Sequence, residues 1–530
     1  MKHKFSWTVL ALLTSTALFS FINDHDPSIS RQRSGKTDQD SLNTKIAFWK
    51  SKFLDVHKDG TITYHPDEQG NTLPDFSLVG YHHGFIPIPK LKVLKTLKPI
   101  DGDAGKMIQQ AIDEVAAQAP DQNGHRGTIL LSKGTYPIAG TIHINADGIV
   151  LKGEGNTAEG TRLIATGKGS RSLLQINGTG KITETPGTRV NITDKYLPVG
   201  AKSFNVTDPK AFKAGDKIIL YRPGSANWIK DIQMDQIIAR EGTKQWRPEE
   251  YDLSYEREIT KIKGNTIFID NPVVMAIDQK YSTGSIYKYS YKGRLKEVGV
   301  ENMLFESEYA SDTDEDHGNI AIDFDDIENG WVSNITARFF IYAAVSLNTG
   351  AKNITVKDSR CLDAKSIITG GRRYSFNNNG QQNLFMNLET TEGRHDYVTG
   401  AKTAGPNVFY NCKSRNTHAD IGPHHRWASG TLYDNIDTDG QINVQDRGNW
   451  GSGHGWAGVT QVLWNCTVES AAVQNPWASG KNYAIGLKGK KVAGRLPGKP
   501  DGEWEAQDQQ NLQPSSLFLA QRKAAHLKTP

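Results

Sequence analysis

Cysteine is scarce in this sequence, which has three among its 530 residues, Cys361, Cys412 and Cys466. Three cysteines are too few for a disulfide framework. An excess of charge is lacking as well, because 62 Lys and Arg oppose 58 Asp and Glu, for a formal net charge of +4. This balance gives no reason to expect nucleic-acid binding, so any electrostatic preference must come from a local patch.

Long apolar runs are lacking after the first residues. The run from Phe5 to Ile22 follows a short basic start and precedes a polar stretch. This order is typical of a secretory signal peptide, here residues 1–22. No later segment is apolar enough to span a bilayer. We therefore expect a protein that is secreted or periplasmic and has no membrane insertion after signal cleavage.

Helical patterns are few. An amphipathic pattern covers residues 103–120, and a second candidate helix covers 514–526 and begins at Pro514. The 51 glycines and the many Asn and Thr residues favour β structure instead.

Short alternating segments recur in the second half of the chain. They are "NITVK" (353), "NLFMN" (383), "NVFYN" (407), "TLYDN" (431) and "QVLWN" (461), whose starts are 30, 24, 24 and 30 residues apart. Four end in asparagine: Asn387, Asn411, Asn435 and Asn465. Short strands at this period predict a parallel β-solenoid in which the asparagines stack as a hydrogen-bonded ladder. A β-sandwich with coincidental spacing is the alternative.

The N-terminal half follows the same plan. The stretch "GTILLSKGTYPIAGTIHINADGIVLKGEG" (127–155) contains three short strands separated by glycine turns, and the helix before it can cap the first coil. Together with the asparagine ladder, these motifs resemble the right-handed parallel β-helix proteins of the pectate-lyase superfamily over about residues 100–485. The resemblance implies an all-β, single-stranded, right-handed parallel β-helix. It implies no substrate, because the superfamily includes lyases, hydrolases and phage tailspikes.

The expected organisation has four parts. A signal peptide (1–22) and an N-terminal extension (23–95) precede the parallel β-helix (96–486). A small β-rich insertion interrupts the helix at about 196–290, and a linker and helix (487–530) follow it.

The ladder predicts which residues of successive coils are neighbours, about 4.8 Å apart. An offset of 24 residues places Arg394 over His418, Asp396 over Asp420, Gly400 over His424, and Lys402 over Arg426. Aligning "IITG" (367–370) with "YVTG" (397–400) adds Arg372 to the column of Lys402 and Arg426.

This alignment predicts a basic ridge. Arg372, Lys402 and Arg426 form it, and Arg373, His424 and His425 flank it. Like charges about 5 Å apart repel by about 3 kcal/mol at an effective dielectric constant near 20. A bound anionic polymer explains such a column better than stability does, although three splayed surface side chains are the alternative.

A second patch contains groups suited to proton transfer: Arg394, His395, Asp396, His418 and Asp420. A structural salt-bridge network would explain the same residues. Further on, the glycine-rich stretch 447–458 carries Trp450 and His454. Such a tryptophan can stack on a sugar ring or can simply cover the core.

Two metal sites are conceivable. "NIDTDGQINVQD" (435–446) approaches a calcium loop through Asp437, Asp439, Asn443 and Asp446, but its flanks are strands and its last acid is Asp. Zinc through His418, His424 and His425 has no recognised spacing. We therefore predict no cofactor, with calcium as the open alternative.

The cysteines test the register. Cys412 and Cys466 both follow ladder asparagines, but the coil of Ile436 lies between them. Two coils separate them by more than a disulfide can bridge, which predicts buried free thiols.

The function that these patterns favour is a polysaccharide lyase that cleaves a uronic-acid-containing polysaccharide by β-elimination in a groove along the β-helix. Arg394 and Arg426 would neutralise the carboxylate, His418 would be the base, and His424 or His425 the acid. Arg372 and Lys402 would hold neighbouring uronates. A glycoside hydrolase using Asp396 and Asp420 and a non-catalytic glycan-binding solenoid are the alternatives. The expected partner is an acidic polysaccharide, bound by a monomer.

Overall fold

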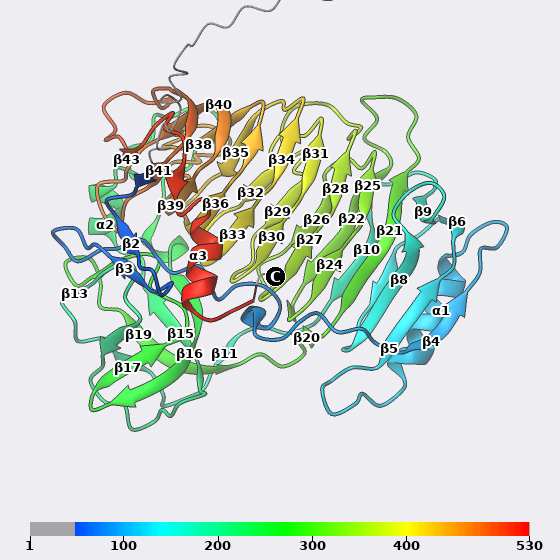
Figure 1. Ribbon diagram of the computed structural model, residues 1–530, viewed down its shortest axis with the longest axis horizontal. Coiled ribbons are helices and arrows are strands. Elements are labelled where there is room, and N and C mark those ends of the chain that lie inside the picture. The colour runs from blue at the N-terminus through cyan, green and yellow to red at the C-terminus, as the bar shows by residue number, and fades with distance from the viewer. Residues whose placement is uncertain (1–47, 529–530) are drawn as a thin grey trace, which may run out of the picture. The chain divides into compact units, whose positions relative to one another are not determined.

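The computed structural model describes residues 48–528, and the predicted signal peptide lies outside them. Most of the described chain winds into short parallel strands that stack on three faces (Figure 1). The prediction of an all-β parallel β-helix is confirmed. In the described part of the chain, no helix has the length and hydropathy needed to cross a membrane.

Each coil between the two ends of the β-helix contributes a strand to each face. Face one consists of β4 (Val93–Leu97), β5 (Gly127–Leu131), β8 (Ile149–Gly155), the first part of β21 (Gly299–Ser307), β24 (Trp331–Ser333), β27 (Thr355–Lys357), β30 (Leu384–Met386), β33 (Ala404–Tyr410), β36 (Ala428–Asp434), β39 (Gly458–Trp464), β41 (Tyr483–Ile485) and β43 (Glu503–Glu505). Face two consists of β6 (Gly134–Ile138), β9 (Thr161–Ala165), the second part of β21, β25 (Thr336–Arg338), β28 (Arg360–Leu362), β31 (Glu389–Thr391), β34 (Lys413–Arg415), β37 (Asp437–Thr438), the first part of β40 (Thr467–Val473) and β42 (Lys488–Lys491). Face three consists of β7 (Ile142–Ile144), β10 (Arg171–Asn177), β22 (Gly318–Asp325), β26 (Ala343–Leu347), β29 (Phe376–Asn378), β32 (Tyr397–Thr399), β35 (Asp420–Pro423) and β38 (Gln441–Val444), which pairs with the end of β40.

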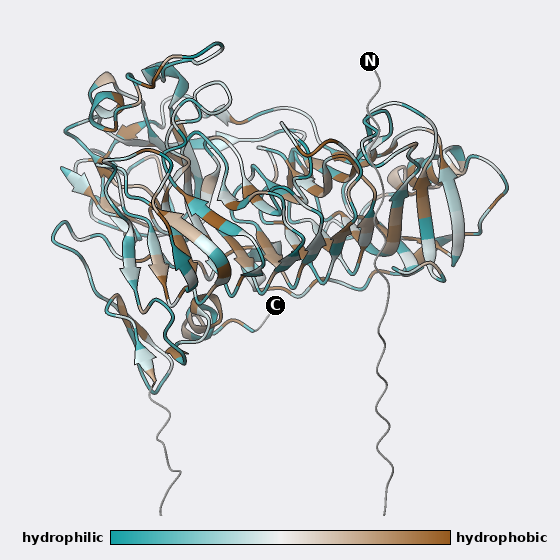
Figure 2. Ribbon diagram, turned by 90° about the horizontal axis from the view of Figure 1, so that it is seen from above, coloured by the Kyte–Doolittle hydropathy of each residue, from teal (hydrophilic) through white to brown (hydrophobic). Residues whose placement is uncertain are grey.

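The core fills the inside of the coils because alternate residues of each strand point inward. Hydrophobic and hydrophilic residues accordingly alternate along the strands (Figure 2). On face one, the inward rings of Phe385, Phe409 and Tyr433 stack in successive coils, with centroids 4.7 and 5.4 Å apart. The repeat therefore specifies the packing as well as the fold.

The predicted asparagine ladder exists at the turn between faces one and two. Asn411 donates to Asn387 (Nδ2 to Oδ1, 2.7 Å), and Asn465 donates to Asn435 (2.9 Å). All four residues have φ between 52° and 57°. Asparagine tolerates this left-handed conformation better than most residues do, which explains its recurrence at the corner.

The ends of the β-helix differ from the predicted boundaries. Helix α1 (Gly105–Ala116) packs its buried face on the first coil as predicted, but β4 before it already belongs to face one. At the other end β43 extends face one beyond residue 486, so the predicted linker contains strands.

A cover lies over the outside of face one. It contains α3 (Leu517–Ala524), β44 (Leu512–Gln513), β1 (Trp49–Lys50), the hairpin of β2 (Leu54–Val56) and β3 (Ile62–Tyr64), and a 3-10 turn (Tyr81–Gly84); β1 pairs with β44 (Figure 1). Asp434 of β36 anchors α3 by accepting hydrogen bonds from Ser516 Oγ (2.8 Å) and the Phe518 amide (2.7 Å).

The insertion is a separate antiparallel unit that begins earlier than residue 196. Its elements are β11 (Thr183–Glu184), β12 (Val190–Asn191), β13 (Tyr196–Leu197), β14 (Ser203–Asn205), β15 (Lys217–Arg222), α2 (Ala226–Asp231), a 3-10 turn (Pro248–Glu250), β16 (Leu253–Lys263), β17 (Thr266–Ile269), β18 (Ile277–Asp278) and β19 (Ser285–Ser290). A short pair, β20 (Leu295–Lys296) with β23 (Ile327–Glu328), follows its return. Its core includes Trp427 of the β-helix, whose ring lies 4.8 Å from that of Trp228. The insertion is therefore packed firmly on the late coils.

Cys412 and Cys466 are buried free thiols, as the register predicted, and Cys361 is a third. Burial raises the pKa of Cys361, Cys412 and Cys466 to about 12. We expect none of them to react with a thiol reagent in the native protein and all three to react in concentrated denaturant, because thiolate and access are both required. Fast labelling of the native protein, measured by mass spectrometry, would contradict this burial.

Candidate active site

A pocket of about 620 Å³ opens on the outside of face three, beside the insertion. Its polar lining comes from four successive coils. We call it the histidine pocket and define it by Tyr374, Arg394, His395, Asp420, His424, His425, Arg447, Trp450 and His454.

The four histidines of the pocket form a contiguous group. The His424 ring lies 4.4 Å from the ring of His395, 5.2 Å from that of His425 and 5.1 Å from that of His454. The rings of His425 and His454 are 4.9 Å apart. They meet because β32 and β35 are in register and the next coil returns through the glycine-rich stretch 447–458.

Burial keeps these imidazoles neutral. It is the largest cause that lowers the pKa of His395 and of His425 to about 4 and that of His454 to about 3. The same cause places the pKa of His424 well below its usual range. Nearby positive charges, Arg447 among them, act in the same direction. A neutral imidazole can accept a proton, whereas a protonated one cannot.

A buried ion pair between an aspartate and an arginine lines the pocket. Asp420, which is 7% exposed, pairs with Arg447, which is 2% exposed. Burial raises the pKa of Asp420, but the positive charge of Arg447 and the hydrogen bonds to the carboxylate act with the neighbouring groups and together lower the pKa below its ordinary value. His395 Nδ1 bonds to the Asp420 carbonyl oxygen (2.6 Å), which fixes the ring orientation.

Tyr374 adds a hydroxyl to this group. Its oxygen lies 3.0 Å from His424 Nε2, and burial raises the pKa of the phenol. Within residues 48–528, neither ring nitrogen of His425 or of His454 takes part in a hydrogen bond, and the buried His424 Nδ1 has no partner. The pocket thus combines a proton donor with proton acceptors that have capacity left.

The pocket carries positive charge. Its one acid, Asp420, is neutralised by Arg447, while Arg394 donates to the Gly370 carbonyl oxygen and has no acidic partner among the described residues. The insertion and the glycine-rich stretch form the adjacent rim, where Lys402 donates to the Glu250 carbonyl oxygen (2.8 Å) and Arg426 to Ser452 Oγ (2.7 Å). Such a surface favours an anionic ligand.

The predicted register is correct for the coils of Asn387 and Asn411 and wrong for the coil before them. Val398 pairs with Gly422, an offset of 24, and the Lys402 amide donates to the Arg426 carbonyl oxygen. Phe376, however, pairs with Tyr397, an offset of 21.

The prediction of a three-membered basic ridge is therefore wrong. Arg372 lies in a loop before β29, where it binds Glu315 through Nε (2.6 Å) and Nη2 (2.8 Å). Lys402 and Arg426 remain neighbours along the backbone, but their side chains reach different partners on the rim.

The second patch is divided. His418 points away from the histidine pocket and bonds to Glu392 (Nε2 to Oε2, 2.7 Å). Glu392 lines another pocket with Arg373. The sequence prediction grouped Arg373 and His418 with the other histidines, and the structure corrects it by separating them. Asp396 is 1% exposed and accepts a hydrogen bond from Ser375 Oγ (2.6 Å). Asp396 does not line the histidine pocket with Asp420. The two residues are neighbours along the backbone, but their side chains bind different partners.

The calcium loop is not assembled. Asp437 pairs with Arg415 (2.7 Å), Asp446 with Lys499 (2.9 Å), and Asp439 accepts from Thr417 Oγ1 (3.0 Å). Asn443 donates to Gln441. Among the described residues, no three His, Cys, Asp or Glu side chains form a group that could hold a metal ion.

Two residues of the pocket were missed in the sequence. Tyr374 follows the loop whose register was wrong, and Arg447 opens the glycine-rich stretch noted only for Trp450 and His454. The offset of 21 would have placed Ser375 over Asp396 and thus Tyr374 beside His395.

No family model and no curated protein match the chain. Several solved structures do. The Gp54 tailspike of Acinetobacter baumannii bacteriophage AP22, solved with A. baumannii capsular saccharide, is 10% identical with a TM-score of 0.28, covering 78% of this chain and 73% of that one. The DFA-IIIase of Arthrobacter chlorophenolicus A6, solved with GF2, is 10% identical with a TM-score of 0.36, covering 81% and 86%. An iota-carrageenase complexed to iota-carrageenan fragments is 10% identical with a TM-score of 0.32, covering 73% and 59%. Identities and TM-scores this low transfer no function, which has to be derived from the pocket itself.

Proposed function

We propose that the protein is a lyase that cleaves a uronic-acid-containing polysaccharide by β-elimination in the histidine pocket. One observation carries the proposal: four neutral imidazoles and a tyrosine hydroxyl surround a positively charged pocket whose single acid is already paired. Such a pocket can both attract a carboxylate and move a proton.

β-Elimination makes three demands on a protein. The uronate carboxylate must be neutralised, the C5 proton must be removed, and the glycosidic oxygen must receive a proton. Arg394 would meet the first demand, since its guanidinium lines the pocket and a planar fork can bind a carboxylate through two hydrogen bonds. Neutralising the carboxylate makes the C5 proton more acidic, because the negative charge that develops on C5 is shared with the carboxylate.

His425 would be the base. It is neutral, its ring nitrogens are free of hydrogen bonds within the described chain, and its pKa of about 4 exceeds that of His454. The bound carboxylate would offset the surrounding positive charge and strengthen this base in the complex.

Tyr374 would be the acid. Its raised pKa keeps the phenol protonated, and the contact with His424 Nε2 at 3.0 Å orients the hydroxyl. The C5–H electron pair then forms the C4–C5 double bond as the C4–O bond breaks, and the leaving oxygen takes the Tyr374 proton. Trp450, 38% exposed, would stack on a neighbouring sugar, and Arg426 and Lys402 on the rim would bind further uronates.

The hydrolase alternative needs two carboxyl groups flanking one bond. Asp396 and Asp420 do not line a common pocket, and Asp420 is held by Arg447. This geometry favours the lyase.

The test is incubation with a panel of acidic polysaccharides, following ultraviolet absorbance of the unsaturated product and, separately, new reducing ends. Absorbance and reducing ends rising together support the lyase. Reducing ends alone would mean hydrolysis, and retention on an immobilised glycan without turnover would mean a binding solenoid; either result contradicts the proposal.

The pH dependence of kcat/KM should carry the signature of a buried base. Because His425 has a pKa of about 4, kcat/KM is expected to stay level from neutral pH to about pH 5 and to fall only as His425 is protonated. An exposed histidine would lose activity near its ordinary pKa of about 6.5. Steady-state rates across this range distinguish the two, and an acid limb near the ordinary value would contradict the assignment.

A further inference from the structure

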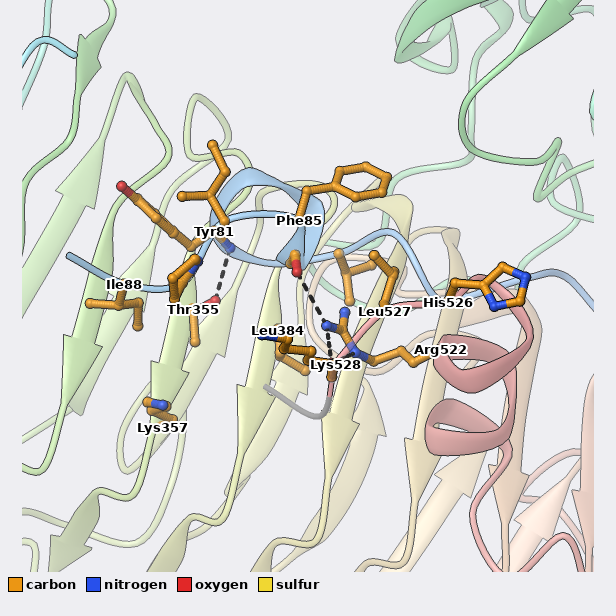
Figure 3. A pocket seen from close by; sticks show the side chains of 14 residues that line it. Tyr81, Phe85, Ile88, Thr355, Lys357, Leu384, Arg522, His526, Leu527 and Lys528 are labelled. Carbon is orange, nitrogen blue, oxygen red and sulfur yellow. Dashed lines mark hydrogen bonds between the residues drawn. The ribbon is translucent and has the colours of Figure 1, made fainter. Parts of the chain in front are cut away.

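A second pocket, of about 360 Å³, lies on face one at the edge of the cover (Figure 3). Face one supplies its floor through Thr355 and Lys357 of β27 and Leu384 of β30. The segment after the turn at Tyr81 crosses above it, and α3 with the residues after it closes one side. We call it the cover pocket; it shares no residue with the histidine pocket.

Most of the cover pocket is apolar. Val79, Phe85, Ile88 and Leu384 line it, and Leu384 belongs to the buried cluster beneath α3. The pocket is therefore a gap in a hydrophobic interface. Its volume falls in the range of roughly 300–1,000 Å³ that small-molecule sites occupy.

The charged groups at the pocket are all positive. Lys357, Arg522 and Lys528 line it, and no Asp or Glu does. Between residues 48 and 528, no ion pair joins any of these cations to a carboxylate.

Arg522 is the most unusual of them, since it is 2% exposed. Its guanidinium donates only to carbonyl oxygens, those of Ser77, Gly84 and Lys528. A buried positive charge without a negative partner is costly, and an anion beside it would offset that cost.

The mouth of the pocket is both apolar and basic. Phe85 and Ile86 are 63% and 51% exposed, although they are large hydrophobic residues. Lys357 and Lys528 line the same pocket, and Lys528 is exposed. Exposed apolar side chains beside lysines are typical of surfaces that bind anionic amphiphiles.

We propose that the cover pocket binds an acyl chain that carries an anionic headgroup. The chain would lie against Leu384, Ile88 and Phe85, and the headgroup would contact Lys357 and Lys528. A free fatty carboxylate and an anionic lipid share this chemistry.

The test uses the whole protein and alkyl sulfates of six, eight and ten carbons, below their micelle concentrations, in isothermal titration calorimetry. Affinity should rise roughly fourfold for each methylene that enters the pocket. Decyl glucoside and decyltrimethylammonium have the same chain without the negative charge and should bind at least about tenfold more weakly than decyl sulfate. Equal affinity for the three decyl compounds would overturn the proposal.

Variants localise the site. Lys357→Met should weaken decyl sulfate about tenfold and leave decyl glucoside unchanged, since methionine keeps the apolar stem. Lys413→Met, on face two, is the matched control and should change neither. If Lys357→Met leaves decyl sulfate binding intact, the pocket is not the site. Flotation with phosphatidylglycerol vesicles, against phosphatidylcholine vesicles, then separates a lipid from a free carboxylate as the source of the ligand.

Discussion

Replacing His425 by glutamine is expected to lower kcat by about 10²–10⁴-fold on the polysaccharide that the panel identifies, the size usual for loss of a general base. Glutamine keeps a polar side chain of similar reach but cannot take the C5 proton. The fold should be unaffected, because the His425 ring makes no hydrogen bond to the described chain. Steady-state kinetics with a thermal melt measures both effects.

His418→Gln is the matched control. His418 bonds to Glu392 outside the histidine pocket, so its loss should change kcat by less than about twofold. If His418→Gln abolishes turnover while His425→Gln does not, the base belongs to the patch expected from the sequence and our assignment fails.

Tyr374→Phe should lower kcat by about as much as His425→Gln, because phenylalanine keeps the ring but has no proton to give to the leaving oxygen. The double variant should be little worse than the poorer single variant, since residues that act in one step are not additive. Effects that multiply would show that the two groups act in separate steps.

Much of the fold could be predicted because one repeat determines it. An offset of 24 residues between Asn387 and Asn411 carries through to the pairing of Val398 with Gly422. It fails at Arg372 because the preceding coil has a different length and places its extra residues before β29. Ile367 and Ile368 are exposed in this loop, which follows no strand register. Sequence similarity between "IITG" and "YVTG" could not reveal which turn absorbs an insertion.

The candidate site was half predictable. Arg394, His395, His424 and His425 follow from the spacing, as does Asp420. Trp450 and His454 were expected from the glycine-rich stretch instead. The direction of each side chain does not, which is why His418 was grouped with residues that it never meets. The neutral state of the imidazoles depends on burial by the insertion and the glycine-rich stretch, and the pairing of Asp420 with Arg447 depends on a loop of irregular conformation.

The largest stability effect is expected at Lys352, which joins the insertion to the β-helix. Its ammonium lies 3.2 Å from Glu256 of β16 and 3.7 Å from Glu328 of β23. Arg294 also binds Glu256 (2.8 Å), and the four side chains are between 1% and 10% exposed. Lys352→Met leaves two buried carboxylates with too little positive charge, so we expect a loss of about 3–5 kcal/mol in unfolding free energy, measured with urea.

The pH dependence of this loss has a definite sign. Burial raises the pKa of Glu256, but Lys352 and Arg294 outweigh it and lower the pKa to about 2. A depressed folded-state pKa stabilises the protein above the unfolded value of about 4.5, and that contribution disappears as pH falls toward 2. The difference between wild type and Lys352→Met should therefore shrink from pH 7 to pH 3.

The variant Lys217→Met tests whether burial, and not the loss of a positive charge alone, causes the loss of stability. Its ammonium lies 2.8 Å from the same Glu328, but its side chain is 43% exposed, so water can replace it and the expected loss is about 0–1 kcal/mol. Equal losses for the two variants would mean that burial is not what makes Lys352 important.

Because the insertion also forms the rim beside Lys402 and Arg426, Lys352→Met should raise KM for the polysaccharide even below its melting temperature, whereas Lys217→Met should not. The buried charges would then serve catalysis by holding the rim beside the histidine pocket in place.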